Sequence, residues 1–214
     1  DVIASELGPF DALFMVPAFF EGGRVTRDSI HYLGVGSQWI PVHETEFARD
    51  AVFGYHAAYL PEYIAEKTDG RISADAVERI LLADLVDNLM ARLTRFQHNV
   101  CCVVDAVEPD DLQVFATAAL QAIDQGKRFL FRSAASLLNA FVPLPPQPVA
   151  AEHMGRFVRA GQPGAVIVGS HVGKSTRQLD RLFELEGIVG VEVDVLRMDA
   201  QRESLLEGVV SAVS

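Results

Sequence analysis

The residues best suited to chemistry lie in a polar turn, Gly169–Thr176, that follows an apolar run at Ala165–Val168. A segment with helical spacing, Arg177–Glu186, comes next. A strand, a glycine turn and a helix in this order direct backbone N–H groups and the positive end of the helix toward an anion. The turn therefore predicts a phosphate site, although a purely structural turn would explain the same residues.

The end of this turn, Gly173-Lys174-Ser175, also matches the end of a Walker A loop. The first glycine of that motif would fall at Val168, whereas the glycine present is Gly169, so the loop is one residue too short. A Walker A loop needs its full length for its backbone to surround the phosphates. A P-loop NTPase is kept as an alternative.

Two further strand patterns end in side chains suited to an acid substrate. Arg132 and Ser133 follow Phe129–Phe131, and the planar fork of an arginine pairs well with a carboxylate. Asp105 ends the run Val100–Asp105, which places it at the rim where open α/β sheets bind ligands. A surface arginine is the simpler explanation of Arg132.

A third segment contains His43, Glu46 and Arg49, which offer acid–base or carboxylate-binding groups. Their spacing does not require such a role. The simpler interpretation is a helix entry capped by Glu44 or Thr45, with solvated charges.

Composition excludes several classes of function. The chain has 214 residues, a formal net charge of −11 and no Lys/Arg cluster, so nothing predicts nucleic-acid binding. No apolar run is long enough to span a bilayer, and a cytoplasmic protein without a membrane partner is expected. The six histidines show no metal-ligand spacing, so no metal site is expected. The adjacent Cys101 and Cys102 are interpreted as buried structural thiols.

Short apolar runs alternate with helical patterns, which predicts an α/β fold with a mostly parallel sheet and flanking helices. The expected strands are Ala12–Val16, Val100–Asp105, Phe129–Phe131, Ala165–Val168 and Val189–Val195. Gly34 and Gly36 punctuate a predicted hairpin within Ile30–His43. Helices are expected at Arg49–Lys67 and at Ala74–Arg95, the second capped by Ser73.

A proline-rich segment, Val142–Val149, is the best candidate for a domain boundary. It separates a first domain, residues 1–145, from a second domain that begins near residue 150 and continues to 214. Short helices are expected at His153–Ala160 and Ala200–Val213. The chain opens without Met in a helical pattern, and we expect both termini to be cuts in a longer protein.

Taken in order, these segments resemble the four-carbon acid sugar kinase family. The likeness covers nearly all of the chain. It rests on the following motifs: Val16-Pro17-Ala18-Phe19, Gly23-Arg24-Val25-Thr26, Thr45-Glu46-Phe47-Ala48-Arg49-Asp50, Val104-Asp105-Ala106, Arg132–Ser136, and Gly169-Ser170-His171-Val172 with Lys174, Thr176, Gln178 and Leu179. The sequence departs from the family's commoner Ser-Gly-Ser form by having Val168 before Gly169.

The resemblance implies an N-terminal domain that binds a sugar acid and a C-terminal domain that binds ATP with Mg²⁺, with phosphoryl transfer between them. The implied substrate-binding residues are Arg132, Ser133, Asp105, His43 and Arg24. The implied nucleotide-binding residues are Gly169, Ser170, His171 and Thr176. The catalytic aspartate is expected before residue 1, so this piece alone is expected to be inactive. A homo-oligomer and a non-catalytic sugar-acid binding module are left open.

Overall fold

The computed structural model describes residues 2–50, 53–142, 149–158, 164–170, 172–194 and 198–213. The chain divides into two compact units, Asp1–Pro148 and Val149–Ser214. The first unit holds every strand found among the described residues. The proline-rich segment expected to form a domain boundary lies almost wholly in residues 143–148, which are outside the described ranges.

A four-stranded parallel sheet forms the centre of the first unit, in the order β5-β6-β1-β7. Its strands are β1 (Ala12–Val16), β5 (Glu78–Ile80), β6 (Val100–Val104) and β7 (Phe129–Ser133). Because β1 and β6 lie inside the sheet and are covered on both faces, they read as continuous apolar runs. The α/β fold with a mostly parallel sheet is confirmed.

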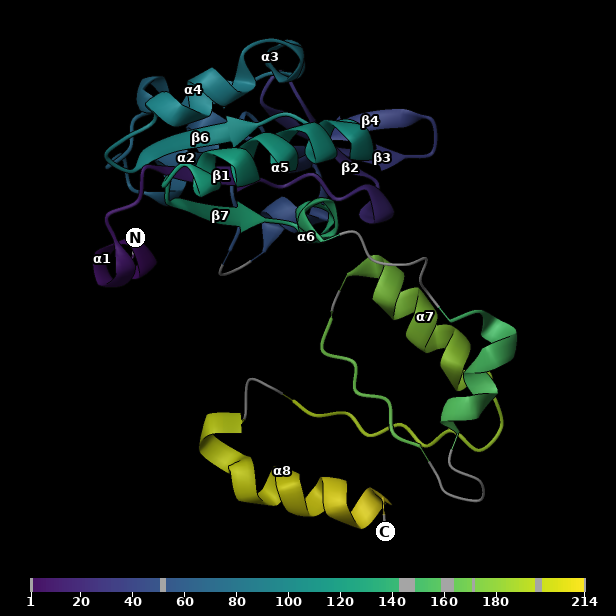
Figure 1. Ribbon diagram of the computed structural model, residues 1–214. Coiled ribbons are helices and arrows are strands. Elements are labelled where there is room, and N and C mark those ends of the chain that lie inside the picture. The colour runs from purple at the N-terminus through teal and green to yellow at the C-terminus, as the bar shows by residue number, and fades with distance from the viewer. Residues whose placement is uncertain are drawn as a thin grey trace. The chain divides into compact units, whose positions relative to one another are not determined.

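Helices cover both faces of this sheet (Figure 1). One face carries α3 (Leu82–Val86), α4 (Leu89–Arg95), α5 (Pro109–Asp124) and α6 (Ala135–Phe141), and α2 (Leu60–Lys67) packs on the other. A short α1 (Val2–Leu7) precedes β1. The cysteines divide between the two faces, with Cys102 in the larger core cluster and Cys101 in the smaller one. Both are buried free thiols, as expected.

An aromatic cluster around Phe14 fills the larger core. Phe14 is fully buried at the middle of β1, and its ring lies 5.1 Å from Phe115 and 5.1 Å from Phe129, measured between centroids. A third ring, Phe131, stacks 5.6 Å away. These contacts join the central strand to its neighbour β7 and to α5.

The N-terminus of α5 shows why the helix begins where it does. Pro109 occupies the first turn, where its missing N–H costs nothing. The carboxylate of Asp111 accepts hydrogen bonds from the backbone N–H of Val107 at 2.8 Å and of Glu108 at 3.0 Å. Asp111, in the first turn of α5, thereby fixes the chain that leads into the helix.

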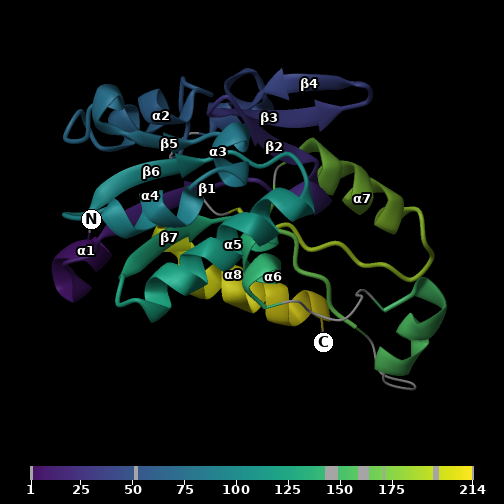
Figure 2. The same cartoon turned by 45° about the horizontal axis from the view of Figure 1, so that its top comes forward.

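A second, antiparallel sheet lies beyond the carboxyl ends of the main strands (Figure 2). It contains β2 (Arg24–Arg27), β3 (Ile30–Val35) and β4 (Gln38–Pro41). The expected hairpin is confirmed, with β2 as an additional strand that the sequence did not predict. Three single turns of 3-10 helix surround it: Phe20–Gly22, Val42–Glu44 and Glu46–Arg49.

The long helix expected at Arg49–Lys67 is wrong in its first half. Only Leu60–Lys67 is α-helical, after a separate 3-10 turn that ends at Arg49. Pro61 explains the difference, because proline lacks the N–H that a helix interior requires and is tolerated in the first turn. Thr45 precedes the 3-10 turn at Glu46–Arg49, but its side chain makes no capping hydrogen bond there.

The helix expected at Ala74–Arg95 is also wrong. This stretch contains a 3-10 turn at Ala74–Ala76, which Ser73 precedes without capping it through its side chain, and then the edge strand β5, α3 and α4. Asn88 separates the two helices in a left-handed conformation with φ of 56°. Arg92 on α4 bonds Glu78 of β5 at 2.7 Å and Asp84 of α3 at 3.1 Å. The same apolar spacing therefore serves three short elements held together by one arginine.

The second unit has helices but no strand among its described residues. The strand expected at Ala165–Val168 is wrong, and so is the one expected at Val189–Val195 over its described part, 189–194. A parallel strand needs a neighbour to pair its backbone groups, and the described residues provide none. Ile167 is accordingly 96% exposed.

The helices predicted for this unit agree more closely with the structure. A 3-10 helix occupies Ala151–Phe157, close to the expected His153–Ala160, whose last two residues lie outside the described ranges. The helix α7 spans Gly173–Phe183, and α8 spans Met198–Val213. The expected helices after the glycine turn and at the end of the chain are confirmed.

Replacing Phe14 by alanine is expected to lower the free energy of unfolding by about 3–5 kcal/mol, because it opens a cavity among packed rings. Urea titration followed by circular dichroism measures this loss. Phe53→Ala is the matched control, since the Phe53 side chain is 75% exposed and its removal should change stability by less than about 0.5 kcal/mol. Equal losses in the two variants would contradict the central place given to Phe14.

Candidate functional site

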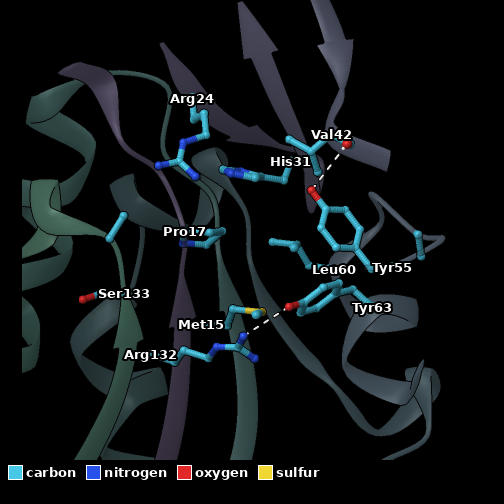
Figure 3. A pocket seen from close by; sticks show the side chains of 12 residues that line it. Met15, Pro17, Arg24, His31, Val42, Tyr55, Leu60, Tyr63, Arg132 and Ser133 are labelled. Atoms are coloured by element: carbon cyan, nitrogen blue, oxygen red, sulfur yellow. Dashed lines mark hydrogen bonds between the residues drawn. The ribbon is translucent and has the colours of Figure 1, made fainter. Parts of the chain in front are cut away.

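A cavity of about 270 Å³ opens at the carboxyl ends of β1 and β7 (Figure 3). Met15 and Pro17 contribute from the end of β1, and Arg132 and Ser133 contribute from the end of β7. Parallel strands point their carboxyl ends to the same edge of the sheet, which is where open α/β sheets place ligand sites. The volume is near the lower end of the range for small-molecule pockets, roughly 300–1,000 Å³.

The small sheet forms a second wall of the pocket through Arg24 on β2 and His31 on β3. It is joined to the main sheet by two backbone hydrogen bonds between Thr26 and Ala106, at 2.9 and 3.0 Å. The turn between β2 and β3 has positive φ at both Asp28 and Ser29, as a two-residue hairpin turn requires. This tight turn fixes how β3 presents His31 to the pocket.

Asp105 secures this hairpin turn and does not line the pocket. Its Oδ1 accepts a hydrogen bond from the backbone N–H of Ser29 at 2.9 Å, and its side chain is almost completely buried. Among the described residues, Asp105 Oδ2 and Ser29 Oγ have no hydrogen-bond partner. Burial raises the pKa of Asp105 to about 6, against the stabilising hydrogen bond from Ser29.

The third wall comes from the segment before α2 and from α2 itself. Tyr55 and Tyr63 meet edge to face, with their ring centroids 5.4 Å apart. Tyr63 OH accepts a hydrogen bond from Arg132 Nη2 at 3.1 Å, and the guanidinium lies 5.6 Å from the Tyr63 ring centroid. Tyr55 OH donates to the carbonyl oxygen of Val42 at 3.4 Å. Tyr63 thereby holds Arg132 at the cavity, and Tyr55 packs against Tyr63.

The charges of the pocket are of one sign. No aspartate or glutamate is among the described residues that line it, whereas two arginines are. Within the described part of the chain, neither Arg24 nor Arg132 has a carboxylate within ion-pair distance. Arg24 instead lies over the Phe19 ring, 5.1 Å from its centroid. An uncompensated pair of guanidinium groups in a small cavity is suited to an anionic ligand.

His31 adds a hydrogen-bonding group to this pocket without adding charge. The ring is only 6% exposed, and its Nδ1 lies 3.0 Å from Oγ1 of the fully buried Thr26. Burial, and then the positive charge of Arg24, lower the pKa of His31 to about 4. The imidazole is therefore neutral at physiological pH.

The structure brings together three of the residues predicted to bind substrate, Arg24, Arg132 and Ser133. It places Asp105 behind the hairpin turn, and it leaves His43 exposed, 3.9 Å from the carboxylate of the neighbouring Glu44. Neither Asp105 nor His43 lines the pocket.

Three polar residues that line the pocket were not predicted from the sequence: His31, Tyr55 and Tyr63. His31 could have been predicted from the hairpin. It lies directly opposite Thr26, and Thr26 shares a face of β2 with Arg24, two residues earlier. Tyr55 lies in the irregular segment before α2 and Tyr63 lies on α2, and no sequence pattern indicated that either would reach the pocket.

Of the residues predicted to bind nucleotide, Gly169 and Ser170 precede α7, and Thr176 lies in its first turn. His171 lies outside the described residues. Ser170 Oγ accepts a hydrogen bond from the backbone N–H of Val172 at 3.3 Å, and a side chain added at Gly169 would meet nothing within 4 Å. Gly169, Ser170 and Thr176 are all exposed.

The described ranges contain neither a metal-binding cluster nor a membrane-spanning helix. No three side chains of histidine, cysteine, aspartate or glutamate gather there in a way that would hold a metal ion. No helix there has the length and hydropathy that crossing a bilayer requires.

The sequence profile of a sugar-binding N-terminal domain matches residues 1–141. The chain belongs to this family. The match covers the pocket and all the strands described above, and it bears out the resemblance to the four-carbon acid sugar kinases. The cavity lined by Arg24 and Arg132, called the arginine pocket below, therefore lies in the sugar-binding domain.

Two solved structures with a similar fold come from the DUF1537 family. A Haemophilus influenzae protein has a TM-score of 0.48 and 20% identity, with 66% of this chain and 31% of that chain covered. A Bordetella bronchiseptica domain of unknown function, solved with bound citrate as a domain-swapped dimer, has a TM-score of 0.42 and 24% identity, with 61% and 29% covered. The alignments thus span about a third of those chains. No curated protein matches the sequence.

The raised pKa of Asp105 predicts a pH-dependent difference between the wild-type protein and Asp105→Asn. A buried carboxylate is costly, so ionisation between about pH 4 and pH 6 should destabilise the wild-type fold, while the amide has no charge to gain. The stability of the variant relative to wild type should therefore rise with pH, by up to about 3 kcal/mol.

Urea titrations of both proteins at pH 4 and pH 8 measure this difference. Taking the difference removes groups common to the two, including His31, whose lowered pKa acts in the opposite direction as the pH falls. A stability difference that does not change with pH would contradict a buried, uncompensated charge at Asp105.

Proposed function

We propose that the first unit binds a sugar acid in the arginine pocket, and that the complete protein phosphorylates this acid with ATP. The substrate would be a four-carbon acid of the threonate or erythronate type. One observation carries the first half of the proposal: two arginines without a carboxylate partner among the described residues line a pocket without an acidic side chain. The family match supports a sugar as the ligand.

The side chains around the arginines suit the rest of such a ligand. Tyr63 already accepts from Arg132 and keeps its own O–H for a substrate hydroxyl. Ser133 and the neutral His31 provide further hydrogen-bonding groups for hydroxyls. Phosphoryl transfer depends mainly on positioning and on electrostatic stabilisation, so a pocket that fixes the acid and its hydroxyls contributes directly to catalysis.

The second half of the proposal concerns the nucleotide. The family resemblance assigns Gly169, Ser170, His171 and Thr176 to ATP, and the helix α7 that begins at Gly173 supports this assignment by directing its first N–H groups toward that turn. ATP would bring Mg²⁺ bound to its phosphates. The described residues form no cluster of side chains that would bind a metal ion, so we assign no protein ligands to the Mg²⁺.

A P-loop has less support than this assignment. The turn is one residue shorter than a Walker A loop, because its first glycine is Gly169 and residue 168 is a valine. Lys174 is exposed on the first turn of α7. We therefore favour backbone and hydroxyl contacts to the phosphates over a lysine-centred site.

A non-catalytic sugar-acid binding protein is the second candidate. It is favoured by the lack of any carboxylate among the described lining residues, since phosphorylation of a hydroxyl uses a general base. In the kinase proposal, the base is an aspartate that does not belong to the residues lining this pocket. ADP release by the complete protein with ATP and a four-carbon acid distinguishes the two candidates.

Arg132→Gln should weaken binding of threonate or erythronate about tenfold to hundredfold, the effect of losing one hydrogen bond to a charged group. Isothermal titration of the purified chain measures the dissociation constant. Arg95→Gln removes the same charge from the last turn of α4, which is outside the pocket, and should leave binding unchanged. Equal effects of the two substitutions would show that overall charge, and not the pocket, determines binding.

In the complete protein, Ser170→Ala should raise the KM for ATP by about tenfold, while Lys174→Ala should have a smaller effect. The reason is that the shortened turn favours hydroxyl and backbone donors over the lysine. Steady-state ADP release at saturating acid measures both values. The opposite order, with Lys174→Ala the more damaging, would support a Walker-type site.

A further inference from the structure

The two arginines of the pocket lie apart, on different elements (Figure 3). Arg24 comes from β2 in the small sheet, and Arg132 comes from the end of β7 in the main sheet. Figure 3 shows their guanidinium groups on opposite sides of the cavity, with Pro17 and Met15 between them. A single carboxylate held by both arginines would need them to converge, and they do not.

Each arginine is held in place by its own aromatic support. The Arg24 guanidinium lies 5.1 Å from the Phe19 ring centroid, and Arg132 bonds Tyr63 OH at 3.1 Å. Cation–π contact orients a guanidinium and leaves its N–H donors available to a ligand. The pocket therefore has two separate sites for an anionic group.

Apart from the two arginines, the lining of the pocket carries no charge. His31 is neutral there, because burial and the adjacent Arg24 hold its pKa at about 4. Tyr55 and Leu60 complete this part of the lining. The middle of the pocket thus suits hydroxyls and carbon atoms, whereas its two sides suit anions.

We propose that the pocket is built for a dianion, a hydroxylated acid that carries a second anionic group at its other end. The second group is a carboxylate or a phosphate monoester, since both present oxygens to an arginine fork. This inference rests on the proposed function of the pocket as an acid site and goes beyond the threonate- or erythronate-type acid, which has one anionic group, by adding a second. A dianion also balances both guanidinium charges, which a monocarboxylate leaves half compensated.

The test compares three four-carbon ligands by isothermal titration of the purified 214-residue chain at pH 5, where the carboxylates are ionised and the phosphate monoester carries about one negative charge. Erythronate has one carboxylate, tartrate has two, and 4-phosphoerythronate has a carboxylate and a phosphate. We expect at least one of the dianions to bind tenfold or more tightly than erythronate. Tighter binding of tartrate assigns the second site to a carboxylate, and tighter binding of the phosphorylated acid assigns it to a phosphate monoester.

Substitutions locate the preference in the pocket. With Arg24→Gln or Arg132→Gln, one anion site remains, so the ratio of dianion to monoanion affinity should fall to about 1. Arg95→Gln, outside the pocket, should leave the ratio at its wild-type value. Arg24→Lys keeps the charge at β2 and should retain part of the preference, and thermal unfolding of each variant checks that it is folded.

The outcomes separate this inference from the proposed function. If erythronate binds and the dianions bind no more tightly, the dianion site is wrong and the sugar-acid site stands. If no ligand binds to the folded wild-type chain, both are wrong. A dianion preference that persists unchanged in Arg24→Gln and Arg132→Gln would place its cause outside the pocket and would overturn the inference.

Discussion

The attachment of the small sheet to the end of β6 is the constraint on which the pocket depends. The carboxylate of Asp105 accepts the N–H of Ser29 in the hairpin turn, and Thr26 and Ala106 exchange two backbone hydrogen bonds beside it. A further backbone bond, from His31 to Ala58, ties β3 to the segment that leads into α2. Three walls that come from distant parts of the sequence are thereby held in register around one cavity.

This attachment has an energetic cost that is localised at one residue. A carboxylate with one unpartnered oxygen among the described residues is an unfavourable group to bury, and a neutral side chain would avoid most of that penalty. The same side chain is what stabilises a turn with positive φ at two consecutive non-glycine residues. Burial of Asp105 thus lowers the stability of the fold, while its hydrogen bond to Ser29 fixes the position of the wall that carries Arg24 and His31.

Much of the first unit could be predicted from the sequence, because its strands are buried on both faces. Ala12–Val16 and Val100–Val104 lie inside the sheet, where only apolar side chains fit. The beginning and end of each strand can therefore be recognised from where its apolar run begins and ends. The edge strand β5 was missed, since three residues with two exposed charged side chains resemble a helix surface as much as a strand. In the second unit the apolar runs were found, but strand formation needs pairing partners that no local pattern reveals.

The candidate site was predictable only in part. Arg132 and Ser133 were found because they directly follow a recognisable strand, and Asp105 was found for the same reason although it serves the fold. His31 and the tyrosines depend on the hairpin folding back over the sheet, which is a long-range arrangement. Position after a strand therefore indicated which residues are near the rim, and only the structure distinguished those that line the pocket.

The edge strand β5 has a consequence for how the sheet behaves toward other chains. A strand of three residues offers few backbone groups for pairing, and the exposed Glu78 on it is held by Arg92 at 2.7 Å. An additional strand that paired here would have to cover this ion pair and remove its charges from water. Charge and shortness together therefore protect this edge against intermolecular sheet growth and the aggregation that follows from it.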